Sequence, residues 1–230
     1  MKFYGLQKMT LLDFPGKVAC TVFTGGCNFR CPFCHNALLV TEIDNSQTYD
    51  EDEIISFLEK RRGLLDGVCV TGGEPLLHPS VVRFIERVKS LGFAVKLDTN
   101  GSFPDTLADI IGAGIVDKVA MDIKNSAEKY GITVGIKDFD ITPVDKSISL
   151  LLEGRVPYEF RTTVVRELHE VSDIEKIAKR IAGAQEYYLQ NFVDSGNLIC
   201  AGMSAHGKDT LVEMKNTARL FVPSTEIRGI

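Results

Sequence analysis

Short apolar runs alternate with amphipathic runs along nearly the whole chain. Six of the apolar runs have the length and β-branched content of strands. Most are continuous rather than alternating, which is typical of parallel strands covered on both faces. The predicted strands span residues 18–23, 67–71, 93–98, 118–124, 158–165 and 186–192.

The segments between these strands carry helix start and stop signals. Asp50 with Glu53 forms a capping-box pattern, and Gly63 predicts the end of that helix. Ser80 and Gly92 bracket a second helix with an apolar stripe. Two later helices are predicted to start at Thr142 followed by Pro143, and at Ser172 with Glu175 as its capping partner.

Six strands alternating with helices predict a parallel sheet with right-handed crossovers, which a doubly wound sheet and a barrel both satisfy. Polar residues gather where the predicted strands end, as they do at the active-site face of barrel enzymes. We therefore predict an α/β fold that is a partial (β/α)6 TIM-like barrel. The length of 230 residues fits a single domain over residues 1–230.

Composition limits the kinds of partner that this chain is expected to have. The net charge is −5 and the isoelectric point is about 5.5, which argues against a nucleic acid as the main partner. No stretch approaches the roughly 18 apolar residues of a membrane helix, and the N-terminus lacks the pattern of a secretory signal. We expect a soluble cytoplasmic protein with no membrane partner.

Three of the six cysteines, Cys27, Cys31 and Cys34, lie in the stretch "TGGCNFRCPFCHN". Structural zinc needs four protein ligands, and the fourth would have to be a solitary residue. A [4Fe–4S] cluster held by three cysteines instead leaves one iron open to another ligand. The spacing favours the cluster, and a non-catalytic zinc-binding α/β module remains the alternative. The candidates for a fourth zinc ligand are His35, Cys69, Cys200 and His206.

This cysteine spacing resembles that of the radical S-adenosylmethionine enzymes. The aromatic Phe33 before the third cysteine and the Gly72-Gly73-Glu74 run after the second strand also match that family. The resemblance implies a barrel of the radical S-adenosylmethionine type. It also implies that S-adenosylmethionine chelates the open iron and is reductively cleaved to methionine and a 5′-deoxyadenosyl radical. Glu74 and the two glycines would then hold the methionyl ammonium.

Three further motifs resemble the activases of glycyl radical enzymes. They are the Asn36 of "CHN", the Asp98 of "DTNG", and the Asp122 and Lys124 of "DIK". The resemblance implies that Asn36, Asp98 and Lys124 contact S-adenosylmethionine, and that Asp98 and Asp122 could share a monovalent cation. Arg161 lies within an apolar strand, where an unpaired charge is costly, so we predict that it meets a carboxylate of the cofactor or of a partner.

No cysteine lies between Cys34 and the second strand, so no ferredoxin-like insert is expected. The opening "LQKMTLLDFPGK" and the closing "STEIRG" resemble the activating proteins of anaerobic ribonucleoside-triphosphate reductase. The implied reaction installs a glycyl radical on that large partner, with an electron from a flavodoxin or ferredoxin. Another glycyl radical enzyme or a small molecule is the alternative substrate.

Residues outside these motifs receive plainer interpretations. Cys20 and Cys69 lie within strands and are predicted to be core residues. His169 adjoins a predicted helix start and is expected at the surface. The glycine- and serine-rich segment 194–209 is either a connecting loop or a mobile rim over the site.

Overall fold

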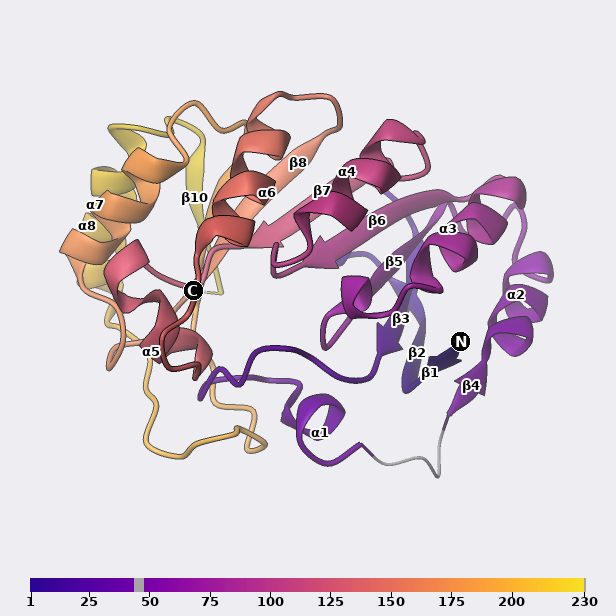
Figure 1. Cartoon of the computed structure of the whole chain (residues 1–230), viewed down its shortest axis with the longest axis horizontal. Coiled ribbons are helices and arrows are strands. Elements are labelled where there is room, and N and C mark those ends of the chain that lie inside the picture. The colour runs from indigo at the N-terminus through magenta and orange to yellow at the C-terminus, as the bar shows by residue number, and fades with distance from the viewer. Residues whose placement is uncertain (44–47, 230) are drawn as a thin grey trace. The chain divides into compact units, whose positions relative to one another are not determined.

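The computed structural model describes residues 1–43 and 48–229, which form two compact units (Figure 1). The first unit comprises Met1–Asn28, Leu38–Thr99 and Asp105–Val119. The second unit comprises Phe29–Ala37, Asn100–Pro104 and Ala120–Ile230.

The first unit is built on four paired strands in the order β6-β5-β3-β2. Three of them, β3 (Ala19–Thr24), β5 (Gly67–Gly72) and β6 (Ala94–Thr99), are parallel, whereas β2 (Gly5–Thr10) runs antiparallel to β3. β3 and β5 are almost entirely buried, which explains their continuous apolar sequence. A small ladder joins β1 (Lys2–Phe3) to β4 (Tyr49–Asp50).

The helices of the first unit lie in the segments that connect or follow its strands. They are α1 (Ala37–Val40), α2 (Glu51–Glu59), the 3-10 helix η1 (Pro75–Leu77), α3 (Val81–Ser90) and α4 (Pro104–Gly112). α2 confirms the predicted capping box, because the backbone N–H of Asp50 donates to Glu53 Oε2 at 2.7 Å. α3 has Ser80 as its N-cap, and Gly92 follows its last turn with φ +90°. The apolar stripe of α3 is fully buried. Burying each of these side chains stabilises the folded state by about 1.5–3 kcal/mol.

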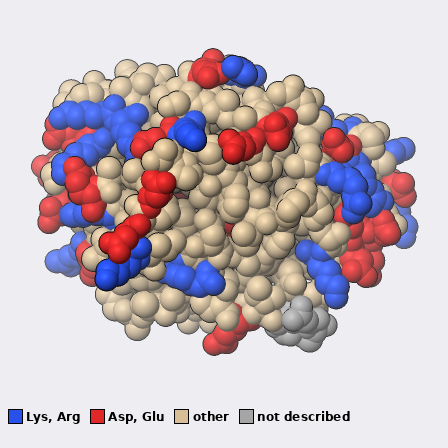
Figure 2. Space-filling model, in the orientation of Figure 1, with Lys and Arg blue, Asp and Glu red and all other residues tan. Residues whose placement is uncertain are grey.

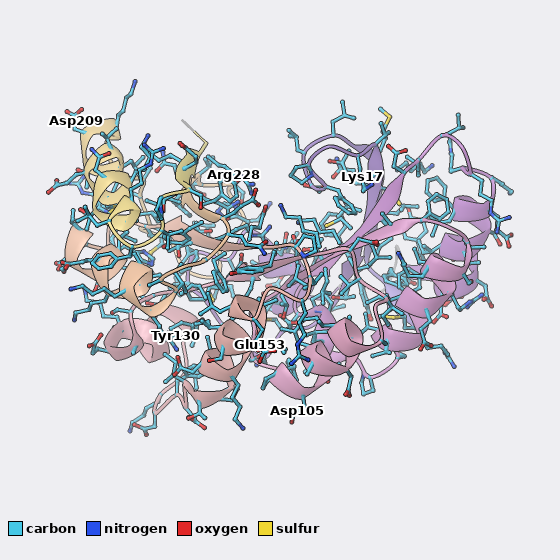
Figure 3. All side chains as sticks on the ribbon, turned by 90° about the horizontal axis from the view of Figure 1, so that it is seen from above. Lys17, Asp105, Tyr130, Glu153, Asp209 and Arg228 are labelled. Carbon is cyan, nitrogen blue, oxygen red and sulfur yellow. The ribbon has the colours of Figure 1, made fainter. Side chains whose placement is uncertain are left out.

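The second unit contains the end of β7 (Lys118–Asp122) and three parallel strands in the order β10-β9-β8. The strands are β8 (Tyr158–Val164), β9 (Tyr187–Asn191) and β10 (Thr225–Arg228). The helices are η2 (Ala127–Lys129), α5 (Tyr130–Val134), α6 (Thr142–Leu152), α7 (Val171–Arg180) and α8 (Lys208–Arg219). α7 packs against α8. Tyr130 of this unit, labelled in Figure 3, has no exposed surface.

All six predicted strands are present, with ends displaced by one or two residues. Two helix starts differ from the prediction. Ile141, not Thr142, is the N-cap of α6. α7 begins two residues early, with Glu170 as N-cap, because Asp173 accepts the Glu170 N–H at 2.9 Å and is anchored by Lys129 at 2.6 Å. The strands β1, β2, β4 and β10 were not predicted.

Over the described residues, no helix combines the length and apolarity needed to cross a bilayer. On the face shown in Figure 2, basic and acidic side chains lie interspersed rather than in a patch of one sign.

Candidate active site

In the first unit, the start of the cysteine loop passes over the turn that follows β5. Thr24 pairs with Gly72 at the ends of their strands, and the Gly73 N–H donates to Thr24 O at 2.9 Å. The Glu74 N–H then donates to Gly26 O at 2.8 Å. A Cβ on Gly73 would lie 1.9 Å from Gly26 O, and Gly72 has φ +128°. Both glycines are therefore required by the backbone path.

The carboxylate of Glu74 is held by two donors from its own unit. Glu74 is fully buried, and its Oε1 accepts from the Leu76 N–H at 3.0 Å and from Thr99 Oγ1 at 2.8 Å. A buried carboxylate with fixed hydrogen bonds presents its charge in one orientation. Sequence reasoning missed Thr99, although it directly follows Asp98 in the "DTNG" motif.

Asp98 has a cationic partner that sequence reasoning also missed. Lys96 is only 1% exposed, and its ammonium forms an ion pair with Asp98 Oδ1. The two residues are separated by one position in β6, so strand alternation places them on one face. Lys96 Nζ also lies 4.0 Å from the Sγ of the buried Cys69.

In the second unit, Asp122 receives two cations at the end of β7. Lys124 Nζ lies 3.0 Å from Asp122 Oδ2, and Arg161 Nε from β8 lies 2.9 Å from Asp122 Oδ1. Arg161 therefore meets a carboxylate of its own chain. A cation shared by Asp98 and Asp122 stays a prediction, and each of these carboxylates already has a counter-charge from the protein.

The charges of this group stabilise one another. Burial would raise the pKa of Asp122, but the positive charges of Arg161 and Lys124 outweigh it and hold that pKa well below its usual range. Burial would lower the pKa of Lys124, but Asp122 and the sulfur of Cys31 raise it well above its usual range. The lysine is therefore a permanent cation close to a cysteine of the loop.

The cysteine loop enters the second unit at Phe29, and Cys27 belongs to the first unit. The Cys34 N–H donates to Cys31 O at 3.1 Å, which forms a tight turn between two cysteines. The Cys200 N–H donates to Pro32 O at 2.9 Å, so segment 194–209 is tied to this turn. Phe33 is 4% exposed, and Asn36 is half-buried.

None of the six cysteines, all of which the structure describes, forms a disulfide. Cys20 and Cys69 are buried, which confirms their prediction as core residues, and burial raises the pKa of Cys20 to about 12. Cys31 is 7% exposed, and Cys27 and Cys34 are half-buried. Among residues 1–43 and 48–229, no three His, Cys, Asp or Glu side chains are grouped to hold a single metal ion.

Two histidines flank the cysteine turn. The prediction of His169 as a surface residue is wrong, because it is 1% exposed and its ring lies edge-on to Phe33 at 6.5 Å between centroids. His35 packs against Phe192 at 5.6 Å, and burial together with the charge of Lys124 lowers its pKa. Burial also lowers the pKa of His169, so the neutral form is favoured for both imidazoles near pH 7.

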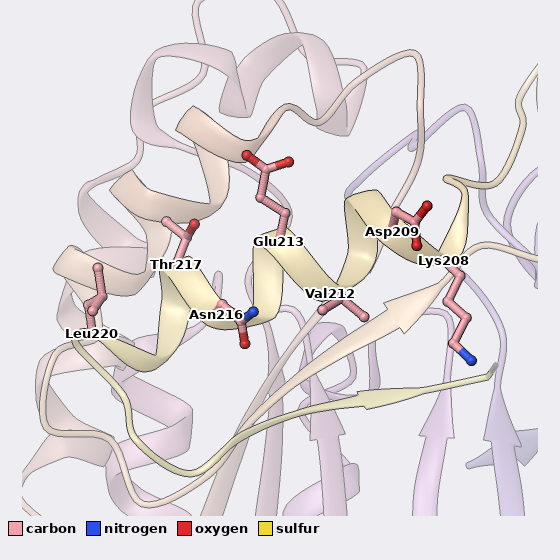
Figure 4. A pocket seen from close by; sticks show the side chains of 7 residues that line it. All are labelled: Lys208, Asp209, Val212, Glu213, Asn216, Thr217 and Leu220. Atoms are coloured by element: carbon pink, nitrogen blue, oxygen red, sulfur yellow. The ribbon is translucent and has the colours of Figure 1, made fainter.

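The residues of the second unit fit a polar cofactor. Asn191, at the end of β9, has a buried Oδ1 with no hydrogen-bond partner among the described residues. Such an atom is costly unless a ligand or water satisfies it. Cys31 and Cys34 supply thiols of the kind that hold an iron–sulfur cluster, and the permanent cation of Lys124 suits the carboxylate of an amino-acid-bearing cofactor. The depression over α8 contains none of the predicted site residues (Figure 4).

Comparisons with known proteins identify the family of this chain. The family described as "Radical SAM superfamily" matches residues 21–181. A Methanocaldococcus jannaschii protein named "Putative glycyl-radical enzyme activating enzyme" is 34% identical over 98% of this chain and 95% of its own. A 7-carboxy-7-deazaguanine synthase of Halobacterium salinarum is 38% identical over 44% of this chain and 37% of its own.

Among solved structures, Streptococcus suis SuiB bound to S-adenosylmethionine superposes with a TM-score of 0.71 at 11% identity. The superposition covers 90% of this chain and 49% of the SuiB chain. SuiB has also been solved with its precursor peptide SuiA.

The chain belongs to the radical S-adenosylmethionine superfamily. It has the predicted α/β fold, the partial (β/α)6 barrel of this superfamily, and it is an enzyme. Its family uses a [4Fe–4S] cluster and S-adenosylmethionine.

Proposed function

We propose that this chain is a single-domain activase that installs a glycyl radical on an anaerobic ribonucleoside-triphosphate reductase. The similarity to an activating enzyme over 98% of the chain carries this proposal. The absence of cysteines between Cys34 and Cys69 and the end motifs "LQKMTLLDFPGK" and "STEIRG" support this target over other glycyl radical enzymes.

In this proposal, Cys27, Cys31 and Cys34 hold the cluster. Once bound and reduced, the cluster would supply the one electron for reductive cleavage of S-adenosylmethionine, the chemistry from which hydrogen-atom abstraction at a glycine of the partner would follow. That electron comes from a flavodoxin or ferredoxin.

The protein's own groups bind and orient S-adenosylmethionine. Thr99 orients Glu74, which accepts hydrogen bonds from the methionyl ammonium. Gly72 and Gly73 allow the backbone before Glu74 to lie against Thr24 and Gly26. Lys124 is a permanent cation suited to the methionyl carboxylate. The remaining proposed contacts are Phe33, Asn36, Asp98 and Arg161.

A peptide-like substrate suits this fold, because SuiB, which shares it, has been solved with a peptide. The local similarity to a 7-carboxy-7-deazaguanine synthase favours a second candidate, a small-molecule substrate. The second candidate predicts that 5′-deoxyadenosine forms at full rate with a small molecule and without any large partner.

The test is anaerobic reconstitution with iron and sulfide, reduction with S-adenosylmethionine present, and quantification of 5′-deoxyadenosine. Cys31→Ala should be silent, and Cys20→Ala, which alters a core thiol, should retain activity. The reductase is then added, and a glycyl radical signal by electron paramagnetic resonance is expected. Cleavage without that signal would reject the reductase as target. Zinc binding without iron binding would reject radical chemistry altogether.

A further inference from the structure

The segment that follows β7 is held by one backbone hydrogen bond to β8, from the Ile123 N–H to Arg161 O at 2.8 Å, and otherwise by side chains. β7 ends at Asp122, so the backbone of Lys124 lies outside the strand. Thr162 Oγ1 donates to Ile123 O at 2.8 Å, and the Lys124 N–H donates to Tyr130 Oη at 3.3 Å. These bonds fix the peptide groups around Lys124 one by one.

His169 supplies the next bond, which is to the carbonyl of Lys124. Its Nε2 lies 2.8 Å from Lys124 O, and its Nδ1 lies 3.1 Å from the backbone N of Val165. A carbonyl oxygen can only accept. Nδ1 also lies 3.2 Å from Val165 O, but that oxygen already accepts the N–H groups of Leu168 and His169, so we assign the proton to Nε2, which makes the shorter contact. The Val165 N–H then donates to an unprotonated Nδ1. Burial lowers the pKa of His169, which agrees with this neutral tautomer.

The same residue contacts two other parts of the candidate site. Its ring edge faces Phe33 between the second and third cysteines of the loop. Its carbonyl oxygen lies 2.9 Å from His206 Nε2, which belongs to segment 194–209. His169 therefore touches the lysine segment, the cysteine turn and the segment tied to that turn through Cys200.

We infer that His169 is a positioning residue: its Nε2–H holds the Lys124 backbone so that the lysine ammonium stays at Asp122, where it binds the cofactor carboxylate. Lysine has a flexible four-carbon stem, so its ammonium is placed only as well as its backbone is. This inference rests on the proposed role of Lys124 in binding S-adenosylmethionine.

Two matched variants separate positioning from packing. His169→Gln places its amide N–H near the position of Nε2, whereas His169→Asn reaches only the position of Nδ1. Both remove the ring that faces Phe33, so both lose similar packing. His169→Asn should raise the KM for S-adenosylmethionine by about tenfold, as loss of an orienting partner does at ligand sites. His169→Gln should stay within about threefold of the wild type, and kcat should change less than KM in both.

Equal KM increases in the two variants would mean that His169 only packs, and unchanged KM in both would overturn the inference. A second readout needs neither cofactor nor partner: the ¹⁵N nuclear magnetic resonance signature of His169 at pH 7. Protonated Nε2 with unprotonated Nδ1 is expected, and the opposite tautomer would overturn the inference. Absence of S-adenosylmethionine cleavage in the wild type would instead reject the proposed function and leave the tautomer result intact.

Discussion

Gly73 passes so close to Gly26 that a Cβ on Gly73 would lie 1.9 Å from the Gly26 carbonyl oxygen. The obstacle is backbone, which cannot rotate away as the end of a side chain can. We expect Gly73→Ala to destabilise the protein by more than about 2 kcal/mol, since forced strain is one of the few sources of large effects. Chemical denaturation of the anaerobic protein measures this cost.

Gly112→Ala is the matched control for that experiment. Gly112 lies at the end of α4, and a Cβ there would meet no atom within 4 Å. The change should be neutral or stabilise by up to about 1 kcal/mol. Equal effects at Gly73 and Gly112 would contradict the close approach of the two loops.

Thr99→Val should weaken S-adenosylmethionine binding. Valine keeps the shape of threonine but removes the donor that lies 2.8 Å from Glu74 Oε1. The buried carboxylate then loses one of its hydrogen bonds, at a cost of about 1–3 kcal/mol. If Glu74 binds the methionyl ammonium, the Kd for S-adenosylmethionine should rise while the iron content stays unchanged. Equilibrium binding to the reconstituted, unreduced enzyme would measure this, and an unchanged Kd would argue against that role.

Asp173→Asn should lower the free energy of unfolding near neutral pH and change it little at acidic pH. Burial would raise the pKa of Asp173, but the hydrogen bond from Lys129 helps hold it below its usual range. A carboxyl with a lowered pKa in the folded state stabilises the protein above its unfolded pKa of about 3.9, and this stabilisation is lost as the pH falls below it. The expected difference is about 1.5–3 kcal/mol at pH 7, shrinking toward pH 3.

Glu170→Gln controls for the acidic charge alone. Glu170 lies 3.7 Å from the same Lys129, but its side chain is 75% exposed. Exposed ion pairs contribute about 0–1 kcal/mol, so urea melts of this variant should nearly match the wild type at every pH. A larger effect at Glu170 than at Asp173 would reverse the assignment of the buried partner.

Cys200→Ala should leave the iron content unchanged. Cys200 contacts the cysteine turn through its backbone N–H, which alanine retains. Reconstituted Cys200→Ala should therefore bind about four irons per chain, as the wild type should if three cysteines suffice. Iron and zinc analysis of the two proteins decides the point. Loss of metal in Cys200→Ala would identify Cys200 as a fourth ligand and favour the zinc alternative.

Helix starts and stops were predicted well where the signal lies within a few neighbouring residues, because such a signal can be read from the sequence alone. The capping box of Asp50 with Glu53 and the stop at Gly92 are examples, and the structure has both. The start of α7 was wrong by two residues because the ion pair of Asp173 with Lys129 spans distant segments. β10 could not be recognised from four residues, since its pairing with β9 is what defines it.

The residues of the candidate site also fall into those that the sequence predicts and those that only the folded chain reveals. Glu74 and Lys124 could be chosen from motifs, because their chemistry shows in the residue type and its place after a strand. Thr99 and His169 could not, because their importance lies in what they touch. His169 contacts a carbonyl 45 positions earlier, and only the folded chain shows that contact.

The bond from Cys200 to Pro32 also has a consequence for the order of biosynthesis. The cysteine turn leaves the ribosome early, but its partners Val134, His169 and Cys200 are translated much later. At about 5–20 residues per second, the thiols of a nascent chain spend roughly 10–30 s without them. We therefore expect metal loading to follow completion of the chain, and protection of the emerging thiols to be a task for the cell rather than for the fold.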